Sequence, residues 1–460
     1  MLEQTLRRFR RYQEIVSVLL RNGFGFILLE HLGLGGKVPL AEADLVQLGR
    51  RLRRVLGELG PTFMKFGQFA STRPDIIPKP VRQELEQLQD KAPFIRYEDV
   101  RRTVEQELGA PLTRLFRRFD PLPLAAASIG QVHYAVLHTG EPVAVKVQRP
   151  NISALIQTDL EIMNDIVPLI EQRFPKAKNY ELHGLLREFS GWLEKELDYT
   201  AEGKNAEKIA QGFDGDHQVI IPHIFWEYTT SRVLTMTYID GVKLNDRQKI
   251  AALSYDQKKI AAHLSKALLQ QILRDGFFHG DPHPGNIFVL SGERIAFVDF
   301  GIVGTLTPDM KRRFANLIRA MTCHNTKSMV KAMLQLGVMP KEVDLDRLRQ
   351  DLDEIRRKHL EVPIAQTTLT ELVNDLSNMT FNNQLEIPAD FVLLGKSLLT
   401  LQGIVHELDP TISLAELAKP FRFQFVKERF LIFNCVKTEV TDFFKLNNRF
   451  NFGKCFKVKE

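Results

Sequence analysis

The most constraining feature of the chain is a pair of short motifs that sets two carboxylates and one amide at a fixed spacing. The motifs are His279–Asn286 (HGDPHPGN) and Val298–Gly301 (VDFG). A phosphoryl-transfer site of the kinase type needs one Asp beside the attacking nucleophile, and an Asn and a second Asp that hold Mg²⁺ against the β- and γ-phosphates. The spacing therefore predicts Asp281 as the catalytic residue, with Asn286 and Asp299 as the Mg²⁺ ligands.

The residues around these motifs support the same interpretation. Pro282, Pro284 and Gly285 predict a rigid loop, and Ile295–Val298 predicts a strand that delivers Asp299. A lone Asp-Phe-Gly occurs by chance in many long chains, whereas the spaced pair is much more specific. The competing interpretation, a turn rich in Pro and Gly with an unrelated strand behind it, leaves a lysine upstream unexplained.

That lysine is Lys146, at the end of a Val-Ala-Val-Lys run on an expected strand. In a kinase-type site such a lysine contacts the α- and β-phosphates, although a solvated lysine at a strand end is a common alternative. Its carboxylate partner is expected on a helix predicted from Leu182 to about Ala210. On that helix Glu202 lies about one and a half turns beyond Glu196, whereas Glu196 and Asp198 are too close together to share a face. We therefore predict Glu202 as the partner of Lys146.

The order of expected elements predicts an α+β chain with two lobes. A small lobe that contains β-strands and helical insertions precedes a larger, mainly helical lobe, which is the plan of protein kinases. Helices are expected before the small lobe, with a restart at Pro61, and the expected segments are 1–60 (basic and helical), 61–122 (a helical extension over the cleft), 123–240 (the small lobe), 241–410 (the large lobe) and 411–460 (a basic, aromatic tail).

Bulk properties restrict the cellular setting. The chain has 460 residues, a formal charge of +6 and three cysteines, at positions 323, 435 and 455, that are too widely spaced for a disulfide framework or a zinc site. A mildly basic chain suits anionic ligands without implying nucleic acid. The amino terminus lacks the pattern of a secretory signal, and Lys396 interrupts the apolar run 391–405. We expect a cytoplasmic protein, peripheral at the membrane surface, with no clear transmembrane helix.

Six motifs in their order along the chain resemble the UbiB family of atypical kinase-like (ADCK) proteins, which are tied to the biosynthesis of ubiquinone. They are Lys65-Phe66-Gly67-Gln68, the turn Ala125–Ser128, the strand Val143–Lys146, Glu196-Leu197-Asp198-Tyr199, the pair Asp281 and Asn286, and Asp299-Phe300-Gly301. The resemblance covers roughly residues 20–410. Its Lys-x-Gly-Gln and Glu-x-Asp motifs are specific to that family.

The resemblance implies roles that the spacing alone does not give. Lys65 is implied to fold over the cleft and to pair with Glu196 and Asp198, where a protein kinase would admit its peptide substrate. A turn built from Ala125, Ala126, Ala127 and Ser128 is implied to replace the usual glycine-rich loop and so to be stiffer.

Gly130 and Met236 complete the expected nucleotide-binding set. The implied cofactors are ATP and Mg²⁺. The implied activity is ATP hydrolysis with little or no phosphorylation of other proteins, in support of quinone-lipid synthesis. The expected partners are a nucleotide, an anionic or quinone-precursor lipid and quinone-biosynthesis proteins.

Two other functions stay open at this point. The loop 279–286 also resembles that of aminoglycoside and choline phosphotransferases, in which the Asp accepts a proton from a small alcohol, so the chain could phosphorylate a metabolite or a lipid. Alternatively it could be a nucleotide-binding scaffold with negligible turnover, although the retention of Lys146, Asp281, Asn286 and Asp299 argues against a dead site. The loop histidines His279 and His283 are metal ligands by type, but packing is the simpler role.

The tail 411–460 mixes many phenylalanines with lysines and arginines. Such a mixture suits a bilayer interface with anionic lipid. Packing of a terminal helix on the large lobe is the plain alternative. Binding to single-stranded nucleic acid is a third option, and we do not expect it.

Overall fold

The computed structural model of the chain describes most residues up to position 412. The described ranges are 2–24, 42–73, 76–88, 93–173, 182–337, 344–361, 369–383, 385, 387–410 and 412. Apart from residue 412, the predicted tail 411–460 lies outside the described residues, and so does what was predicted for it.

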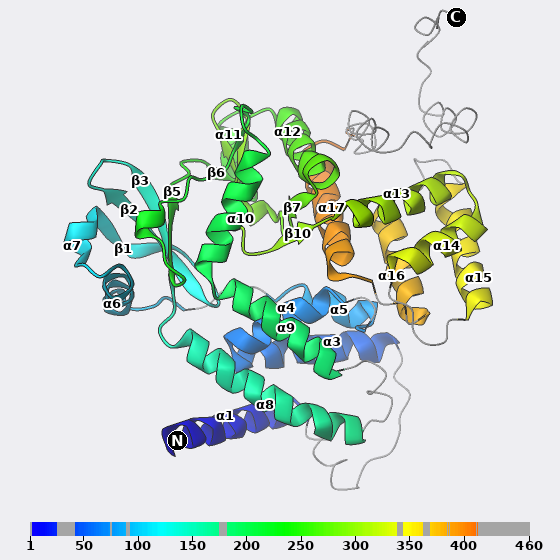
Figure 1. Cartoon of the computed structure of the whole chain (residues 1–460), viewed down its shortest axis with the longest axis horizontal. Coiled ribbons are helices and arrows are strands. Elements are labelled where there is room, and N and C mark those ends of the chain that lie inside the picture. The colour runs from blue at the N-terminus through cyan, green and yellow to red at the C-terminus, as the bar shows by residue number, and fades with distance from the viewer. Residues whose placement is uncertain are drawn as a thin grey trace, which may run out of the picture.

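The chain begins with a helical extension that packs beneath the rest of the fold (Figure 1). Its helices are α1 (Leu2–Arg21), α3 (Glu42–Leu59), α4 (Pro61–Ser71) and α5 (Lys79–Leu85). The restart expected at Pro61 is confirmed, because Gly60 adopts φ 91° and Pro61 occupies the first turn of α4. Apolar faces of these helices form one cluster that includes Ile15, Leu56 and Phe63, and Ile162 joins it from a later helix.

The small lobe is built on an antiparallel four-stranded sheet in the order β1-β2-β3-β5. Its elements are α6 (Tyr97–Leu108), α7 (Leu112–Leu115), β1 (Phe116–Ala126), β2 (Gly130–Leu137), β3 (Pro142–Gln148) and β5 (Val233–Thr237). Strand β1 was not predicted, and the expected boundary at 122/123 falls inside it. Its residues are mostly exposed, with Pro121 and Pro123 among them and register shifts against β2, so the sequence shows no alternation of apolar and polar residues.

Three helices link the small lobe to the extension and to the site. They are α8 (Ile152–Arg173), α9 (Leu182–Glu196) and α10 (Tyr199–Gln211). The single helix expected from Leu182 to about Ala210 is wrong. The chain breaks at Asp198, which leaves helical geometry (φ −105°, ψ 95°) and accepts a hydrogen bond from the Thr200 amide at 3.0 Å. Aspartate is a preferred N-cap residue because its carboxylate satisfies an amide that has no partner within the helix.

The large lobe contains two small sheets. One has the order β4-β9-β8-β6 and the other pairs β10 with β7. Their strands are β4 (Val219–Ile220), β6 (Val242–Lys243), β7 (Phe277–His279), β8 (Ile287–Leu290), β9 (Arg294–Phe297) and β10 (Val303–Thr305). Strand β4 lies parallel to β9 in this lobe, although the sequence placed it in the small lobe, because two residues carry too little pattern to show which sheet they join. Strand β9 ends just before Asp299, as predicted.

Helices make up the rest of the large lobe (Figure 1). They are α11 (Arg247–Ala252), α12 (Gln257–Leu269) with the π-helical segment Gln270–Asp275, α13 (Pro308–Thr322), α14 (Thr326–Leu336), α15 (Leu345–Ile355), α16 (Leu369–Asn382) and α17 (Ala389–Leu408). Helix α12 and its π-helical segment lead into the loop at 279–286, and Gly276 ends them with φ 68°. The kinase-like, two-lobed mixture of helices and small sheets is therefore confirmed.

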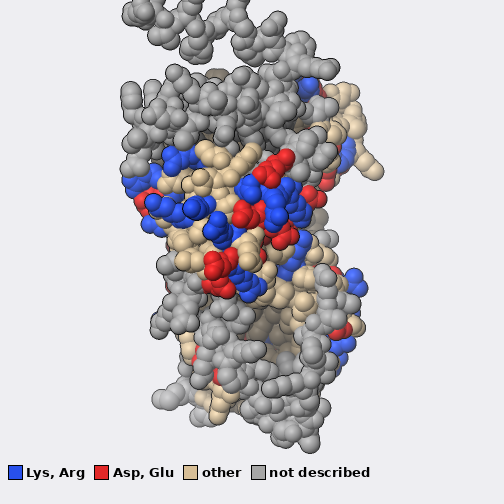
Figure 2. Space-filling view, turned by 90° about the vertical axis from the view of Figure 1, so that its right-hand side faces the viewer, with Lys and Arg blue, Asp and Glu red and all other residues tan. Residues whose placement is uncertain are grey.

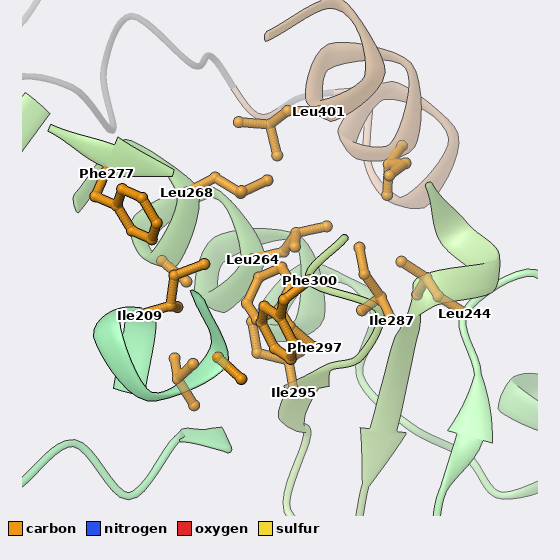
Figure 3. Close-up of a cluster of buried hydrophobic side chains, with 14 of the residues drawn as sticks. Ile209, Leu244, Leu264, Leu268, Phe277, Ile287, Ile295, Phe297, Phe300 and Leu401 are labelled. Atoms are coloured by element: carbon orange, nitrogen blue, oxygen red, sulfur yellow. The ribbon is translucent and has the colours of Figure 1, made fainter. Parts of the chain in front are cut away.

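The main hydrophobic core lies directly beneath the two catalytic motifs. Leu264 and Leu268 of α12 pack with Phe297 at the end of β9 and with Phe300 of the second motif, and Leu401 of α17 belongs to the same cluster (Figure 3). Phe300 is fully buried. The position of the Asp-Phe-Gly motif is thus fixed by the same contacts that hold the large lobe together.

Helix α17 is, by length and composition alone, the one described helix that could cross a membrane. It has 20 residues, Lys396 lies in its middle, and Leu401, Ile404 and Val405 belong to the main core. A core helix passes the same test as a membrane span, so these contacts identify α17 as part of the folded lobe.

The first helix is attached to the fold through a buried ion pair. Arg11 of α1 is 9% exposed and donates from Nε and Nη2 to the two carboxylate oxygens of Asp159 on α8, at 2.7 and 3.0 Å. It also donates to the Leu59 carbonyl at 2.6 Å. Asp159 is fully buried, so its charge depends on this partner.

Removal of Arg11 should therefore be strongly destabilising. We expect Arg11→Met to lower the free energy of unfolding by about 3–5 kcal/mol, because it leaves a buried carboxylate unpaired. The exposed neighbour Arg10 is the matched control, and Arg10→Met should change stability by less than about 0.5 kcal/mol. Chemical denaturation measures both. The double variant Arg11→Met/Asp159→Leu should recover most of the loss, and failure to recover would show that burial of the charge is not the cause.

Candidate active site

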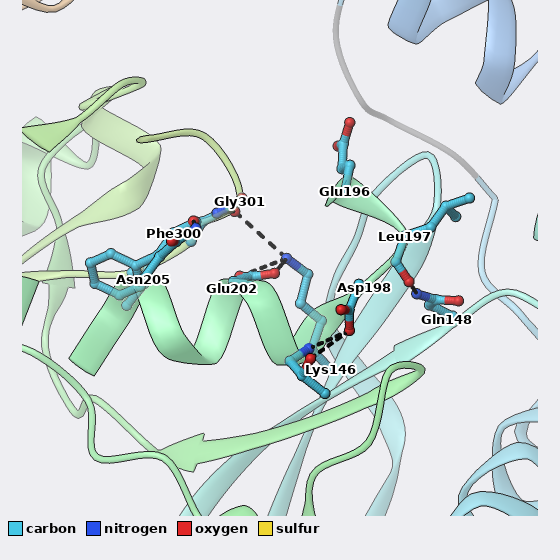
Figure 4. A network of polar contacts seen from close by, with 12 residues as sticks. Lys146, Gln148, Glu196, Leu197, Asp198, Glu202, Asn205, Phe300 and Gly301 are labelled. Atoms are coloured by element: carbon cyan, nitrogen blue, oxygen red, sulfur yellow. Dashed lines mark hydrogen bonds and ion pairs between the residues drawn. The ribbon is translucent and has the colours of Figure 1, made fainter. Parts of the chain in front are cut away.

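The centre of the site is a lysine held between carboxylates from both lobes. Lys146, on β3, donates to both carboxylate oxygens of Glu202 on α10, at 2.9 and 2.8 Å. Its Nζ also lies 3.6 Å from Oδ1 of Asp299. Figure 4 shows the lysine ammonium between Glu202 and the segment that leads into Gly301. The predicted contact between Lys146 and Glu202 is present, and the second motif meets both residues.

The charges in this cluster stabilise one another. Burial alone would lower the pKa of Lys146, but Asp299 and Glu202 outweigh it and raise that pKa well above its usual value. Lys146, assisted by Lys65, holds the pKa of Asp299 below its usual value against the effect of burial. A depressed carboxyl pKa contributes stability that is present above about pH 4 and is lost as the pH falls through the folded-state pKa. Asp299 is thus a carboxylate at neutral pH.

The backbone at Asp299 is strained, and its surroundings hold that strain. Its φ is 64°, which is unusual for a residue other than glycine and costs about 1–3 kcal/mol. The buried ring of Phe300 anchors the next residue, and Asn205 of α10 donates to the Phe300 carbonyl at 3.0 Å. Half of the Asp299 side chain remains exposed. Strain that turns a half-exposed carboxylate toward a lysine indicates a functional position.

The catalytic loop is arranged around a buried histidine. His279 Nδ1 accepts from the Asp281 amide at 3.1 Å, which leaves Nε2 to donate to the Val298 carbonyl at 3.3 Å. Burial lowers the pKa of His279, which keeps it in this neutral form. Both ring nitrogens are used inside the protein, so His279 serves as a clamp between the two motifs. His283 has a comparable local role, because its Nδ1 accepts from the Gly285 amide at 3.1 Å.

The two remaining polar residues of the loop face the same region. Asn286 donates from Nδ2 to the Asp281 carbonyl at 3.3 Å, which leaves its side-chain oxygen available for a cation. Asp281 is one-third exposed and its Oδ1 lies 3.0 Å from Nζ of Lys396, on α17. The contact of Lys396 with Asp281 could not be predicted, because Lys396 lies 115 positions beyond Asp281 on a mainly apolar helix.

The helical extension reaches the site through Lys65. The Lys65 side chain, on α4, is buried and forms an ion pair with Glu196 at the end of α9. Asp198, predicted to share this contact, instead caps α10 through the Thr200 amide and hydroxyl, at 3.0 and 2.7 Å. Asp198 can cap α10 because α9 ends at Glu196 and α10 begins at Tyr199. The prediction of one continuous helix left no place for such a cap.

The other residues of the Lys-x-Gly-Gln motif hold α4 in place. A Cβ on Gly67 would lie 2.3 Å from Leu88 Cδ1 and 2.8 Å from Leu56 Cδ1, so a larger residue would require these leucine side chains to shift. Gln68 donates from Nε2 to the Leu88 carbonyl at 3.3 Å. The motif thus combines one charged contact to α9 with a tight helix packing behind it.

The alanine-rich segment is only partly a turn. Ala125 and Ala126 end strand β1, where they pair with Val132 and Gln131, and the turn itself begins at Ala127. The predicted turn over Ala125–Ser128 is therefore too early by two residues. Extended pairing makes Ala125 and Ala126 stiffer than a loop would be.

Two buried hydroxyl groups near this turn have no hydrogen-bond partner among the described residues. They belong to Ser128, which is fully buried, and to Tyr199, which is 1% exposed. The Tyr199 hydroxyl lies against Gly130, where an added Cβ would approach it to 2.3 Å, and its ring lies 5.0 Å from Lys146 Nζ. An unpartnered buried hydroxyl costs about 1–3 kcal/mol. The hydroxyls of Ser128 and Tyr199 are hydrogen-bond donors that lie near Lys146 and the turn, and such donors suit the phosphates of a nucleotide.

Met236 lies farther from this charged group. It is buried on β5, opposite Ala144 of β3 and bridged to Ile224. Met236 thus lies on β5, the strand that pairs with the Lys146 strand β3 in the small sheet. Its role in nucleotide binding stays a prediction. Tyr199 ends the motif Glu196-Leu197-Asp198-Tyr199, but no role was predicted for it. Its place directly after Asp198, within that motif, was the sequence signal that could have pointed to a functional role.

With this geometry established, the chain can be compared with known proteins. The model of the ABC1 atypical kinase-like domain matches residues 87–333, and that of the UbiB helical domain matches residues 352–413. The chain belongs to the UbiB/ABC1 family of atypical kinase-like proteins. The resemblance stated from the motifs is therefore confirmed, and the helices from α15 to α17 form the family's helical domain.

Individual relatives agree with this assignment. An uncharacterized protein of Synechocystis sp. is 36% identical over 87% of this chain and 70% of its own length. The chloroplastic protein ACTIVITY OF BC1 COMPLEX KINASE 7 of Arabidopsis thaliana is 36% identical over 80% of this chain, which spans only 53% of that relative. A probable protein kinase UbiB of Xanthomonas campestris is 34% identical over 85% of this chain and 73% of its own length.

One solved structure shows the same fold. It is Rv3197 of Mycobacterium tuberculosis, solved as a complex with erythromycin. The match covers 80% of this chain and 93% of the Rv3197 chain, at 27% identity and a TM-score of 0.53. A kinase-like domain implies ATP as the nucleotide, and the residues present fit it. Lys146 and the two unpartnered hydroxyls suit phosphates, and Asn286 and Asp299 supply oxygen ligands of the kind Mg²⁺ prefers. In the described part of the chain, no group of three or more His, Cys, Asp or Glu side chains is placed to hold a metal ion.

Gly130 provides a test of the close packing at the turn. A Cβ there would lie 2.3 Å from the Tyr199 hydroxyl and 2.7 Å from the Val147 carbonyl oxygen, and the second contact is with backbone that cannot easily move. We expect Gly130→Ala to lower the free energy of unfolding by about 1–3 kcal/mol and to weaken nucleotide binding. Gly191→Ala, in α9 with open space around it, should instead stabilise by about 0.5–1 kcal/mol. Equal effects in thermal unfolding would contradict the packing account.

Proposed function

We propose that this protein binds Mg-ATP and hydrolyses it, that it works at a membrane surface, and that it supports the biosynthesis of quinone lipids. The observation that carries the proposal is the convergence of Lys146, Glu202 and Asp299 from two lobes. Lys146 would contact the α- and β-phosphates, while Asn286 and Asp299 would hold Mg²⁺. That ion would neutralise charge that develops on the phosphates.

The residues of the catalytic loop support a simple reaction. A water oxygen attacks the γ-phosphorus, and the bond from this phosphorus to the bridging oxygen of the β-phosphate breaks. The water proton passes to Asp281, and inorganic phosphate and ADP leave. Asp281 is suited to this task because it is partly exposed and its backbone is fixed by His279. An alcohol in place of water would make the same step a phosphorylation.

The extension explains why little protein phosphorylation is expected. Helix α4 carries Lys65 to Glu196 at the end of α9, beside the lysine and carboxylates of the site. Aromatic contacts fix it there, with Phe66 and Phe69 packed on Phe189 at ring-centroid distances of 5.2 and 5.5 Å. A helix packed at this position would exclude an extended peptide, whereas water is small enough to reach Asp281.

The first helix supports the membrane part of the proposal. On α1, four large apolar side chains are exposed at helical spacing, namely Leu6, Phe9, Val16 and Leu20, and Arg7 and Arg10 lie among them exposed. An apolar stripe bordered by arginines suits the interface of an anionic bilayer. The face that carries α14 and α15 differs, because basic and acidic side chains alternate there (Figure 2). Ion pairs also occur in this part of the lobe, such as Arg313 with Asp309 within α13 and Arg356 with Asp353 at the end of α15.

The quinone part rests on the family. A relative named probable protein kinase UbiB covers most of this chain, and the UbiB family is tied to quinone biosynthesis. We therefore propose a cytoplasmic protein, peripheral at the membrane, that acts on or beside a quinone-precursor lipid. The partners would be that lipid and quinone-biosynthesis proteins.

One assay tests this function against its alternatives. Purified protein is given radiolabelled Mg-ATP, with and without vesicles that contain anionic lipid and a quinone-precursor mimic. Release of labelled phosphate, increased by the vesicles, is the expected result. A labelled small molecule or lipid would show a metabolite kinase instead. Binding without turnover would show a nucleotide-dependent scaffold.

The metal assignment gives a sharper prediction. Asp299→Asn keeps the shape of the side chain and removes the charge that would face the ion, so we expect Mg²⁺-dependent ATP affinity to fall by more than about tenfold. Isothermal titration with and without Mg²⁺ measures it. Asp214→Asn, the same change at an exposed position, is the control and should bind normally. Unchanged Mg-ATP affinity in Asp299→Asn would remove Asp299 from the metal site.

The stiff turn and the extension predict altered nucleotide selection. Ala126→Gly should change the ratio of ATP to ADP affinity by about two- to fivefold, because glycine adds conformational freedom equivalent to roughly 0.5–1 kcal/mol. The exposed Ala251 in α11 is the control for Ala126→Gly, as Ala251→Gly should leave the ratio unchanged.

Lys65→Ala should change nucleotide preference or turnover without unfolding the protein. Wild-type binding and turnover in both site variants would contradict these two roles.

A further inference from the structure

Helix α17, in the family's helical domain, contacts the catalytic loop through one of its faces. The residues on this face are Leu393, Lys396 and Ser397, which are three and four positions apart and so lie side by side on a helix. In Figure 1, α17 runs beside β7 and β10, the strands that frame the start of the loop. The contact joins a domain that carries no kinase motif to the residue predicted as the catalytic one.

Two of these residues fix the helix against the loop backbone. Ser397 is buried, and its hydroxyl lies 3.2 Å from the carbonyl oxygens of His279 and Gly280. A Cβ on Gly280 would lie only 2.6 Å from Leu393 Cδ2, so the loop passes directly beneath α17. The position of α17 relative to Asp281 is therefore determined by packing, and a side chain between Leu393 and Ser397 can be aimed at the loop.

Lys396 is that side chain. Its Nζ lies 3.0 Å from Asp281 Oδ1, with the two side chains 39% and 33% exposed. The segment from Phe277 to Leu290, which contains the loop, has no lysine or arginine of its own. The cation that the structure places on Asp281 therefore comes from α17.

We propose that Lys396 is a positioning residue for the catalytic aspartate, and that the helical domain is thereby a working part of the active site. The ammonium holds Oδ1 of Asp281, which leaves Oδ2 to accept the proton of the attacking oxygen. It also places a positive charge beside the point where the phosphoryl group gathers negative charge. This inference rests on the proposed function, because it takes Asp281 as the base of that reaction.

The exposure of the pair separates this role from a structural one. Both partners of this ion pair are about a third exposed or more, so water screens their charges. Such a pair contributes little to stability. Lys396→Met keeps the aliphatic stem and removes the charge, so it should change the melting temperature by no more than about 2 °C. A large change in turnover could then not arise from unfolding.

The test compares three variants in steady-state ATP hydrolysis. Lys396→Met should lower kcat by about 10- to 100-fold while KM for ATP stays within about threefold, because Lys396 contacts the base rather than the phosphates that bind Lys146. Lys396→Arg should restore a substantial part of kcat, since it returns the charge. Lys249→Met, at a lysine that is 72% exposed on α11, should behave as wild type.

The possible outcomes separate this inference from the proposed function. Equal or faster turnover in Lys396→Met overturns the positioning role while hydrolysis stands. A raised KM with unchanged kcat also overturns it, because Lys396 would then be a nucleotide contact. Wild-type protein that binds Mg-ATP in titration but releases no phosphate overturns the hydrolytic function, and the positioning role with it.

Discussion

The structure depends on one electrostatic arrangement, in which the Lys146 ammonium is shared by Glu202 and Asp299. Each of these residues comes from a different element, namely β3, α10 and the segment after β9. A largely buried lysine without a carboxylate would be costly, and the neighbouring carboxylates of Glu202 and Asp299 would repel each other without the lysine. The site thus holds the small and large lobes in register, and it leaves Asp299 half exposed toward the space where a nucleotide would bind.

The elements around this arrangement each restrict a different part of it. The buried His279 ties the catalytic loop to the strand before Asp299, and the core beneath Phe300 fixes the second motif. Helix α4 brings Lys65 from the other side, and α17 brings Lys396. One charged group near the predicted catalytic residues therefore comes from the helical extension, and another comes from α17 at the far end of the large lobe. A kinase-like fold surrounded in this way suits the transfer of a phosphoryl group to a small acceptor, and water is the smallest.

The sequence was most informative where chemistry requires a fixed spacing. The order of expected elements predicted the two-lobed fold, and the spacing of Lys146 and the motifs at 279–286 and 298–301 predicted that Lys146 and Asp299 meet at its centre. It was least informative where the structure depends on contacts between distant segments. Lys396 could not be found from sequence, because nothing local distinguishes a lysine that reaches Asp281 from one that interrupts an apolar helix. The contact of Asp198 with Lys65 was implied by the family resemblance, whereas in the structure Asp198 is the N-cap of α10, a role that becomes visible only once the helix break is known.

The most direct test of the account is chemical labelling with an acyl-phosphate derivative of ATP, which transfers its acyl group to lysines that lie beside the phosphates. Labelled sites are identified by mass spectrometry, with and without excess Mg-ATP. The account predicts that Lys146 is labelled, that Mg-ATP protects it, and that the exposed Lys249 shows no protection. Labelling of Lys146 that Mg-ATP leaves unchanged, or protection confined to lysines outside this cluster, would contradict it.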